Sequence, residues 1–277
     1  MKTLIKGVTL DSRVTDILVE DGKFLCLDVR EGVDADKVID ASGLAVLPAF
    51  YNTHNHAAMS LLRGYADDMP LQTWLQDYIW PFEDKLTAAD IRQGSELAVK
   101  EMVQTGTVFF NDMYFEVEQT IDIVRKYGIR STIGITVMDN HSKAVKEQKL
   151  KFINEFQDPT GGKVSLAMAP HAIYTVGTDN LKEAARTARE HGMKIHIHVS
   201  ETEGEVRDSI AKYGMSPVRY LDSIGLLGPD VVAAHCVHVD DEDLEILKEH
   251  NVTVASCPKS NAKLASGICP VTALLEA

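Results

Sequence analysis

Short apolar runs alternate with longer amphipathic segments along most of this chain. Amphipathic segments of helical length lie between the runs, and one of them begins at Thr87, a suitable N-cap, and stops at Gly106. Strands that are apolar on both faces and alternate with helices predict a parallel sheet covered by helices. Seven such runs follow one another, at residues 46–52, 107–113, 130–138, 164–170, 194–200, 231–236 and 252–257.

Residues 1–45 have a different pattern. Apolar and polar positions alternate roughly by two over 3–10, 16–29 and 37–46, and Asp-Gly and Ser-Gly pairs interrupt them. These short strands cannot bury both of their faces alone, so we expect a small sheet that is completed elsewhere. The chain is therefore divided into an N-terminal strand region, 1–45, and a second domain, 46–277.

Seven strand–helix units in series, without a dinucleotide-binding glycine pattern, favour a (β/α)8 barrel over a doubly wound sheet. Eight strands close such a barrel, and the eighth is not found, because the sequence stops at Ala277 within an expected helix. We therefore expect a barrel truncated before strand eight, with an exposed sheet edge. Association of copies into a homo-oligomer is one way to cover that edge.

Charge and composition narrow the class of protein. The chain has 28 Lys and Arg against 41 Asp and Glu, a formal charge of −13, which argues against a nucleic-acid-binding surface. No run approaches the roughly 20 apolar residues of a membrane span, and the first residues do not resemble a signal peptide. Four scattered cysteines without a C-x-x-C pair indicate a reduced, cytoplasmic enzyme.

Histidines gather at the ends of predicted strands. His54 and His56 form an H-x-H pair at the end of the first run, His198 ends the fifth and His235 ends the sixth. Residues i and i+2 of a strand face the same side, and the carboxyl ends of barrel strands form one mouth. A lone histidine there is usually structural. The pattern as a whole predicts a metal site, for zinc or else for iron or nickel.

Glu201 follows His198 by three residues, just beyond the fifth strand. A carboxylate at this place could carry protons between water and a substrate. The alternative is an acidic residue that stabilises the start of the next helix.

Several longer strings carry a family resemblance: PAFYNTHNHAAMSLLRGYADDMPLQTWLQDYIWPFEDKL, APHAIYTV, HIHVSETEGEV, AAHCVHVDDED and CPKSNAKLASGICPVTALL. In this order they resemble the amidohydrolase superfamily, in its branch of S-adenosylhomocysteine and 5′-methylthioadenosine deaminases, close to the triazine chlorohydrolases. The resemblance implies a metal-dependent hydrolase barrel, and the N-terminal strands fit the small β-sandwich that accompanies it.

The resemblance also implies roles for single residues. His54, His56 and His198 would bind one Zn²⁺, His235 would polarise the attacking water, and Glu201 would shuttle protons and contact a ring nitrogen.

Three further residues correspond to substrate-binding positions. Trp74 would wall the pocket, Glu83 would hold the ribose hydroxyls, and His171 would contact the purine. Each has a plainer alternative, since Trp74 could be core, Glu83 a helix-start acid after Pro81, and His171 a buried structural residue.

The sequence departs from the family pattern in three places. Ala49 stands where the family has glycine, so the backbone there must avoid positive φ. Arg130 starts the third strand, but no second arginine follows to grip a homocysteine carboxylate, which favours methylthioadenosine or adenosine. The fourth zinc ligand, an aspartate after strand eight, is not found, and Asp112 and Asp240 lie elsewhere.

Taken with these residues, the resemblance implies a zinc-dependent hydrolytic deaminase that releases ammonia from 5′-methylthioadenosine, S-adenosylhomocysteine or adenosine. One alternative is an amidohydrolase, chlorohydrolase or deaminase that acts on a triazine, guanine or cytosine ring. Another is a truncated, non-catalytic relative that only binds metal. The expected partner is a small-molecule substrate, with no nucleic acid and no membrane.

Overall fold

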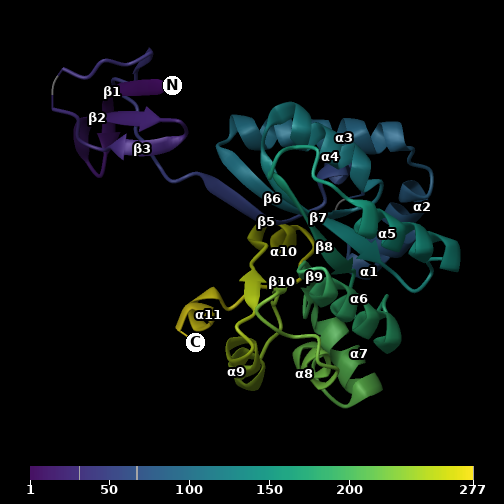
Figure 1. Cartoon of the computed structure of the whole chain (residues 1–277). Coiled ribbons are helices and arrows are strands. Elements are labelled where there is room, and N and C mark those ends of the chain that lie inside the picture. Colours follow the sequence, from purple (N-terminus) through teal and green to yellow (C-terminus); the bar gives the residue numbers. More distant parts are fainter. Residues whose placement is uncertain (31, 67, 277) are drawn as a thin grey trace. The chain divides into compact units, whose positions relative to one another are not determined.

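The computed structural model describes residues 1–30, 32–66 and 68–276 (Figure 1). The chain divides into two compact units, Met1–Ala49 and Phe50–Ala277, and each is described by itself.

The first unit is a four-stranded sheet with the order β3-β2-β1-β4. β1 and β2 form an antiparallel hairpin, whose turn residues Asp11 and Ser12 both have positive φ, as a tight hairpin turn requires. Val8, Ile17 and Ala41 form its small core. The strands are β1 (Lys2–Leu10), β2 (Arg13–Glu20), β3 (Lys23–Cys26) and β4 (Lys37–Asp40).

The second unit is built on a seven-stranded sheet whose strands pair in the order of the chain, β11-β10-β9-β8-β7-β6-β5, with every paired neighbour parallel. This confirms the predicted parallel barrel of the TIM type. The strands are β5 (Phe50–Asn55), β6 (Thr107–Tyr114), β7 (Arg130–Val137), β8 (Val164–Pro170), β9 (Lys194–Val199), β10 (Val231–His235) and β11 (Thr253–Ala255).

Helices follow the strands and cover their outer side, as Figure 1 shows. Within the described ranges, no helix combines the length and the apolarity that crossing a membrane demands. The helices are η1 (Ala57–Leu62), α1 (Leu71–Thr73), η2 (Trp74–Ile79), α2 (Trp80–Glu83), α3 (Ala88–Gln104), α4 (Val117–Tyr127), α5 (Lys143–Glu155), α6 (Thr178–Glu190), α7 (Glu203–Tyr213), α8 (Pro217–Ser223), α9 (Asp241–Glu249), α10 (Pro258–Lys263) and α11 (Val271–Glu276).

Local signals set the ends of two of these elements. Thr87 caps α3 as predicted, and it forms a reciprocal capping box with Asp90. The first barrel strand begins at Phe50, so the predicted start at residue 46 was wrong. Pro48 has no N–H to donate to a sheet, and pairing with β6 begins only at Phe50 and Thr107.

Successive side chains of β9 point alternately into the hydrophobic core and into the barrel interior. Ile195 and Ile197 are fully buried in the main hydrophobic cluster, together with residues of α6 and α8. His196 and His198 lie on the opposite face of the strand, where both rings pack against His54 of β5. A two-residue period therefore places imidazoles inside the barrel and aliphatic side chains outside it.

Candidate active site

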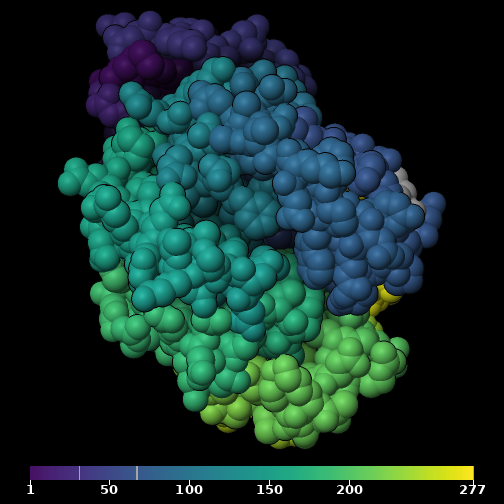
Figure 2. All heavy atoms as spheres, turned by 90° about the vertical axis from the view of Figure 1, so that its right-hand side faces the viewer, coloured from purple at the N-terminus to yellow at the C-terminus, as the bar shows by residue number. Residues whose placement is uncertain are grey.

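The carboxyl ends of the barrel strands surround a cavity of about 640 Å³, a usual size for a small-molecule site. Figure 2 shows a hollow in this face of the molecule, bordered by the blue segment that carries α1, η2 and α2. All eight residues singled out in the sequence line the cavity, namely His54, His56, Trp74, Glu83, His171, His198, Glu201 and His235.

His54, His56 and His198 lie together, with one ring nitrogen of each within 4.8 Å of the others. The H-x-H pair belongs to the end of β5, and His198 belongs to β9, with three strands between them in the sheet order. The three imidazoles therefore meet across the barrel, and no neighbouring pair of strands could hold all of them.

Hydrogen bonds fix which nitrogen of two rings is available. Nδ1 of His56 lies 2.6 Å from the carbonyl oxygen of Met113, and Nδ1 of His198 lies 2.7 Å from that of His171. A carbonyl oxygen only accepts, so each Nδ1 carries the proton and each Nε2 keeps a lone pair.

The two Nε2 atoms lie only 3.3 Å apart. Burial lowers the pKa of His56 to about 4 and that of His198 well below its usual value, so both rings are neutral near pH 7. Two facing lone pairs repel each other unless a cation lies between them, and nitrogen donors of this kind suit a divalent metal. The donor set therefore fits a divalent metal ion.

The Glu201 carboxyl group lies beside these histidines and is almost completely buried. Burial raises its pKa to about 7, while the Ser266 hydroxyl, 3.5 Å from Oε1, acts weakly in the other direction. Nδ1 of His235 lies 3.7 Å from Oε1 of Glu201 and 2.7 Å from the side-chain oxygen of Asn261. A carboxyl group near its pKa at neutral pH is suited to proton transfer.

The three remaining predicted residues line the same cavity. Burial raises the pKa of Glu83 to about 7, and Glu83 accepts a 2.6 Å hydrogen bond from the Tyr114 hydroxyl. Burial lowers the pKa of His171 to about 3, so its ring is neutral. The indole Nε1–H of Trp74 is buried and has no hydrogen-bond partner within the described structure, which leaves a donor for a ligand.

Sequence reasoning missed several residues that support this site. Nε2 of His196 lies 2.8 Å from Nδ1 of His54, and Glu205 accepts hydrogen bonds from the backbone N–H groups of Ser200 and Glu201 at 3.2 and 2.8 Å. The H-x-H pattern of 196–198 was a signal for His196, since both rings must face the same side. Nothing in the sequence around Glu205 separates it from an ordinary helix-start acid.

The structure also places the residues that departed from the family pattern. The backbone of Ala49 does not have a positive φ, as expected for alanine in place of glycine. Asp112 accepts a 2.7 Å hydrogen bond from the backbone of Ala57, and Asp240 caps α9. Arg130 is exposed at the amino end of β7, at the opposite end of that strand from the cavity.

Most of this chain is similar in sequence to curated proteins. The 5-methylthioadenosine/S-adenosylhomocysteine deaminase of Pelotomaculum thermopropionicum is 44% identical over 251 residues, which are 90% of this chain and 58% of that protein. The 5′-deoxyadenosine deaminase of Methanococcoides burtonii is 42% identical over 278 residues, 97% of this chain and 64% of that protein. The chain thus spans about three fifths of the length of these curated relatives.

Solved structures give the same fold. An adenosine deaminase from Xanthomonas campestris with bound zinc superimposes with a TM-score of 0.90 at 31% identity, over 99% of this chain and 66% of that one. A guanine deaminase from C. acetobutylicum, at 22% identity and a TM-score of 0.88, shares the fold. Residues 45–277 match the amidohydrolase family, and with these identities the match shows that the chain belongs to that family.

Proposed function

We propose that this protein is a zinc-dependent hydrolytic deaminase of adenosine-type nucleosides. One observation carries the proposal: three imidazole nitrogens converge in a cavity that also holds Glu201, a buried carboxyl group with a pKa near 7. Two relatives at 42–44% identity are named as deaminases of 5′-deoxyadenosine, or of methylthioadenosine and S-adenosylhomocysteine, and this supports the nucleoside class.

His54, His56 and His198 would hold the zinc ion. When bound, zinc lowers the pKa of a water molecule to about 7 and so supplies a nucleophile at neutral pH. His56 and His198 are oriented for this task by their hydrogen bonds to backbone carbonyls, and His54 by His196.

Glu201 would move the protons. Its carboxyl group gives a proton to the ring nitrogen next to the amino-bearing carbon, which makes that carbon more electrophilic. Water adds its oxygen to the carbon, and its two protons pass to the departing amino group and back to Glu201. The carbon–nitrogen bond then breaks, ammonia leaves, and the ring nitrogen keeps the first proton. One water is consumed for each ammonia released.

Other residues would orient the substrate. His235 is neutral and its Nδ1–H donates to Asn261, so its Nε2 carries the lone pair and would accept a hydrogen bond from the attacking water. Glu83, held by Tyr114, would accept hydrogen bonds from ribose hydroxyls, His171 would contact the purine, and Trp74 would wall the pocket. These roles extend the resemblance seen in the sequence.

The substrate proposal favours nucleosides without a charged tail. Arg130 is exposed at the amino end of its strand, so it does not offer a cation for a homocysteine carboxylate. We therefore rank methylthioadenosine, 5′-deoxyadenosine and adenosine above S-adenosylhomocysteine. Four free cysteines fit a reducing compartment, so we place the enzyme in the cytoplasm.

A substrate panel tests the proposal. The protein expressed from its own gene and loaded with zinc is incubated with methylthioadenosine, 5′-deoxyadenosine, adenosine and S-adenosylhomocysteine, and with guanine, cytosine and a chlorotriazine. Ammonia and chloride release are measured. We expect ammonia from the nucleosides and none from a Glu201→Gln variant. Turnover of a bare ring alone would show another heterocycle hydrolase, and binding of zinc without any turnover would show a non-catalytic relative.

A further inference from the structure

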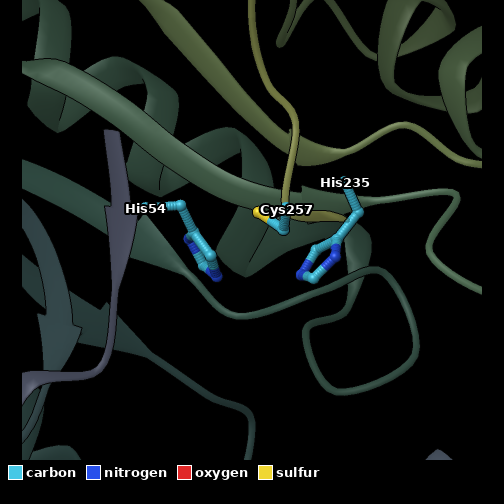
Figure 3. Close-up of side chains that lie close together, drawn as sticks. All are labelled: His54, His235 and Cys257. Carbon is cyan, nitrogen blue, oxygen red and sulfur yellow. The ribbon is translucent and has the colours of Figure 1, made fainter. Parts of the chain in front are cut away.

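Cys257 lies in the cavity wall, and the deaminase proposal gives it no role. It follows β11 by two residues and precedes α10, and its Sγ lies within 4.8 Å of a ring nitrogen of both His54 and His235. Figure 3 shows the sulfur between the two imidazoles. The three side chains come from the ends of three different strands, β5, β10 and β11.

The hydrogen bonds of the two histidines leave their second nitrogens open. Nδ1 of His235 donates to the side-chain oxygen of Asn261 at 2.7 Å, so its Nε2 keeps a lone pair. When Nδ1 of His54 donates to Nε2 of His196, which lies 2.8 Å away, Nε2 of His54 keeps a lone pair too. The Cys257 thiol donates to the carbonyl oxygen of Ala255 at 3.3 Å, a weak bond that is easily given up.

Two imidazole nitrogens and one sulfur form a donor set that differs in kind from the three-histidine set. Thiolate is a soft ligand and selects soft cations, whereas imidazole and carboxylate accept harder ones. His54 belongs to both sets. A neutral imidazole offers one lone pair, so His54 can serve one ion at a time.

We propose that Cys257, His54 and His235 form an alternative site for a soft divalent cation such as Cd²⁺. Binding releases the thiol proton to solvent and forms a sulfur–metal bond, with no oxidation or reduction. Because His54 then leaves the His54–His56–His198 set, capture of the soft ion disables that set. The proposed binding of the soft ion is inferred from the geometry of the three donors alone. Only the resulting loss of activity rests on the proposed function.

Cadmium titration of the metal-free protein tests the site. We expect a near-ultraviolet sulfur-to-cadmium charge-transfer band that saturates at one ion per chain. Cys257→Ser and Cys257→Ala should both lack the band, while circular dichroism shows that they are folded. Cys26→Ser is the matched control, because Cys26 belongs to β3 of the other unit, and it should keep the band. A missing band in the wild type, or a band that persists in both Cys257 variants, overturns the proposal.

Zinc competition gives a second, independent readout. Zinc added to the cadmium-loaded wild type should bleach the band only at a large excess, because the thiolate favours cadmium. If an equimolar amount of zinc removes the band, cadmium does not keep His54 away from the three-histidine set, and the proposed disabling of that set fails. In activity assays, we expect the Cys257→Ser variant to need at least about tenfold more cadmium for inhibition than the wild type. A charge-transfer band in a protein that turns over no nucleoside would refute the proposed function and leave the cadmium site intact.

Discussion

Glu201 is almost completely buried, and this burial raises the pKa of its carboxyl group to about 7. As a proton donor it has to be protonated, which holds below about pH 7 and is lost as the pH rises through that value. We therefore expect kcat/KM for a nucleoside to fall about tenfold per pH unit above the pKa. Rate measurements between pH 5 and 9 check this, because the pH profile of kcat/KM reports the pKa of an essential acid in the free enzyme.

Substitutions test whether Glu201, and not another acidic residue near it in the chain, is the proton donor. Glu201→Gln should lose about 10²–10⁴-fold in kcat, the usual contribution of a general acid. Glu203→Gln, in the exposed first turn of α7, should keep both the rate and the pH profile. An unchanged profile in Glu201→Gln would remove Glu201 from the proton-transfer role.

Glu205 holds the loop on which Glu201 sits. Its two carboxyl oxygens accept backbone hydrogen bonds from Ser200 and Glu201, and the side chain is buried. In Glu205→Gln one acceptor becomes an NH₂ group that faces an N–H donor, so a buried donor loses its partner. We expect a loss of about 1–3 kcal/mol in the free energy of unfolding, measured by urea denaturation.

The same substitution should lower kcat more than it raises KM, because Glu201 is displaced and the rest of the pocket is retained. Asp208→Asn, at an exposed position of the same helix, is the control and should change neither stability nor rate. A fully active Glu205→Gln enzyme would show that the loop keeps its shape without these bonds.

Helix α3 packs tightly against η1, the segment that follows the H-x-H pair. Gly94 is buried where α3 packs on η1, and a Cβ there would lie 2.2 Å from the carbonyl oxygen and 2.8 Å from the Cα of Ala58. Backbone atoms cannot yield cheaply, so Gly94→Ala should destabilise the protein despite a gain of about 1 kcal/mol in helix propensity.

Thermal unfolding measures this effect. Gln93→Ala, on the exposed face of the same turn, should leave the melting temperature nearly unchanged. Since η1 begins directly after His56, Gly94→Ala should also weaken zinc binding, and a variant with normal stability and affinity would contradict the packing argument.

Element-level patterns explain how much could be predicted. The parallel barrel strands and the Thr87 cap follow from local apolar runs and capping chemistry, which the sequence displays directly. The end-of-strand histidines were predicted to meet because parallel strands end at one mouth, and the structure does bring His54, His56 and His198 together.

Contacts between distant segments could not be predicted in this way. The Tyr114–Glu83 and His54–His196 pairs, at 2.6 and 2.8 Å, join elements that only the finished barrel brings together. Cys257 likewise gave no signal in the sequence, because a lone cysteine after a strand is ordinary. Its relation to His54 and His235 depends on the curvature of the whole sheet.

At the scale of the whole molecule, a bound ion would connect parts of the barrel that no backbone hydrogen bond joins. His54 and His56 belong to β5 and His198 to β9, with β6, β7 and β8 between them in the sheet. Without an ion, the Nε2 atoms of His56 and His198 face each other at 3.3 Å, each with a lone pair. Metal binding should therefore stabilise the native barrel and leave the unfolded chain almost unaffected.

Zinc at 100 times its dissociation constant should raise the free energy of unfolding by about 2.7 kcal/mol, and a chelator should remove this gain. Thermal unfolding with and without zinc measures the difference. His56→Ala and His198→Ala should each lose most of the response to zinc, because two ligands cannot hold the ion as three do. His191→Ala, a histidine bonded to Asn154 outside the cavity, should respond to zinc like the wild type. If zinc stabilises all four proteins equally, the ion binds elsewhere, and the three-histidine site is wrong.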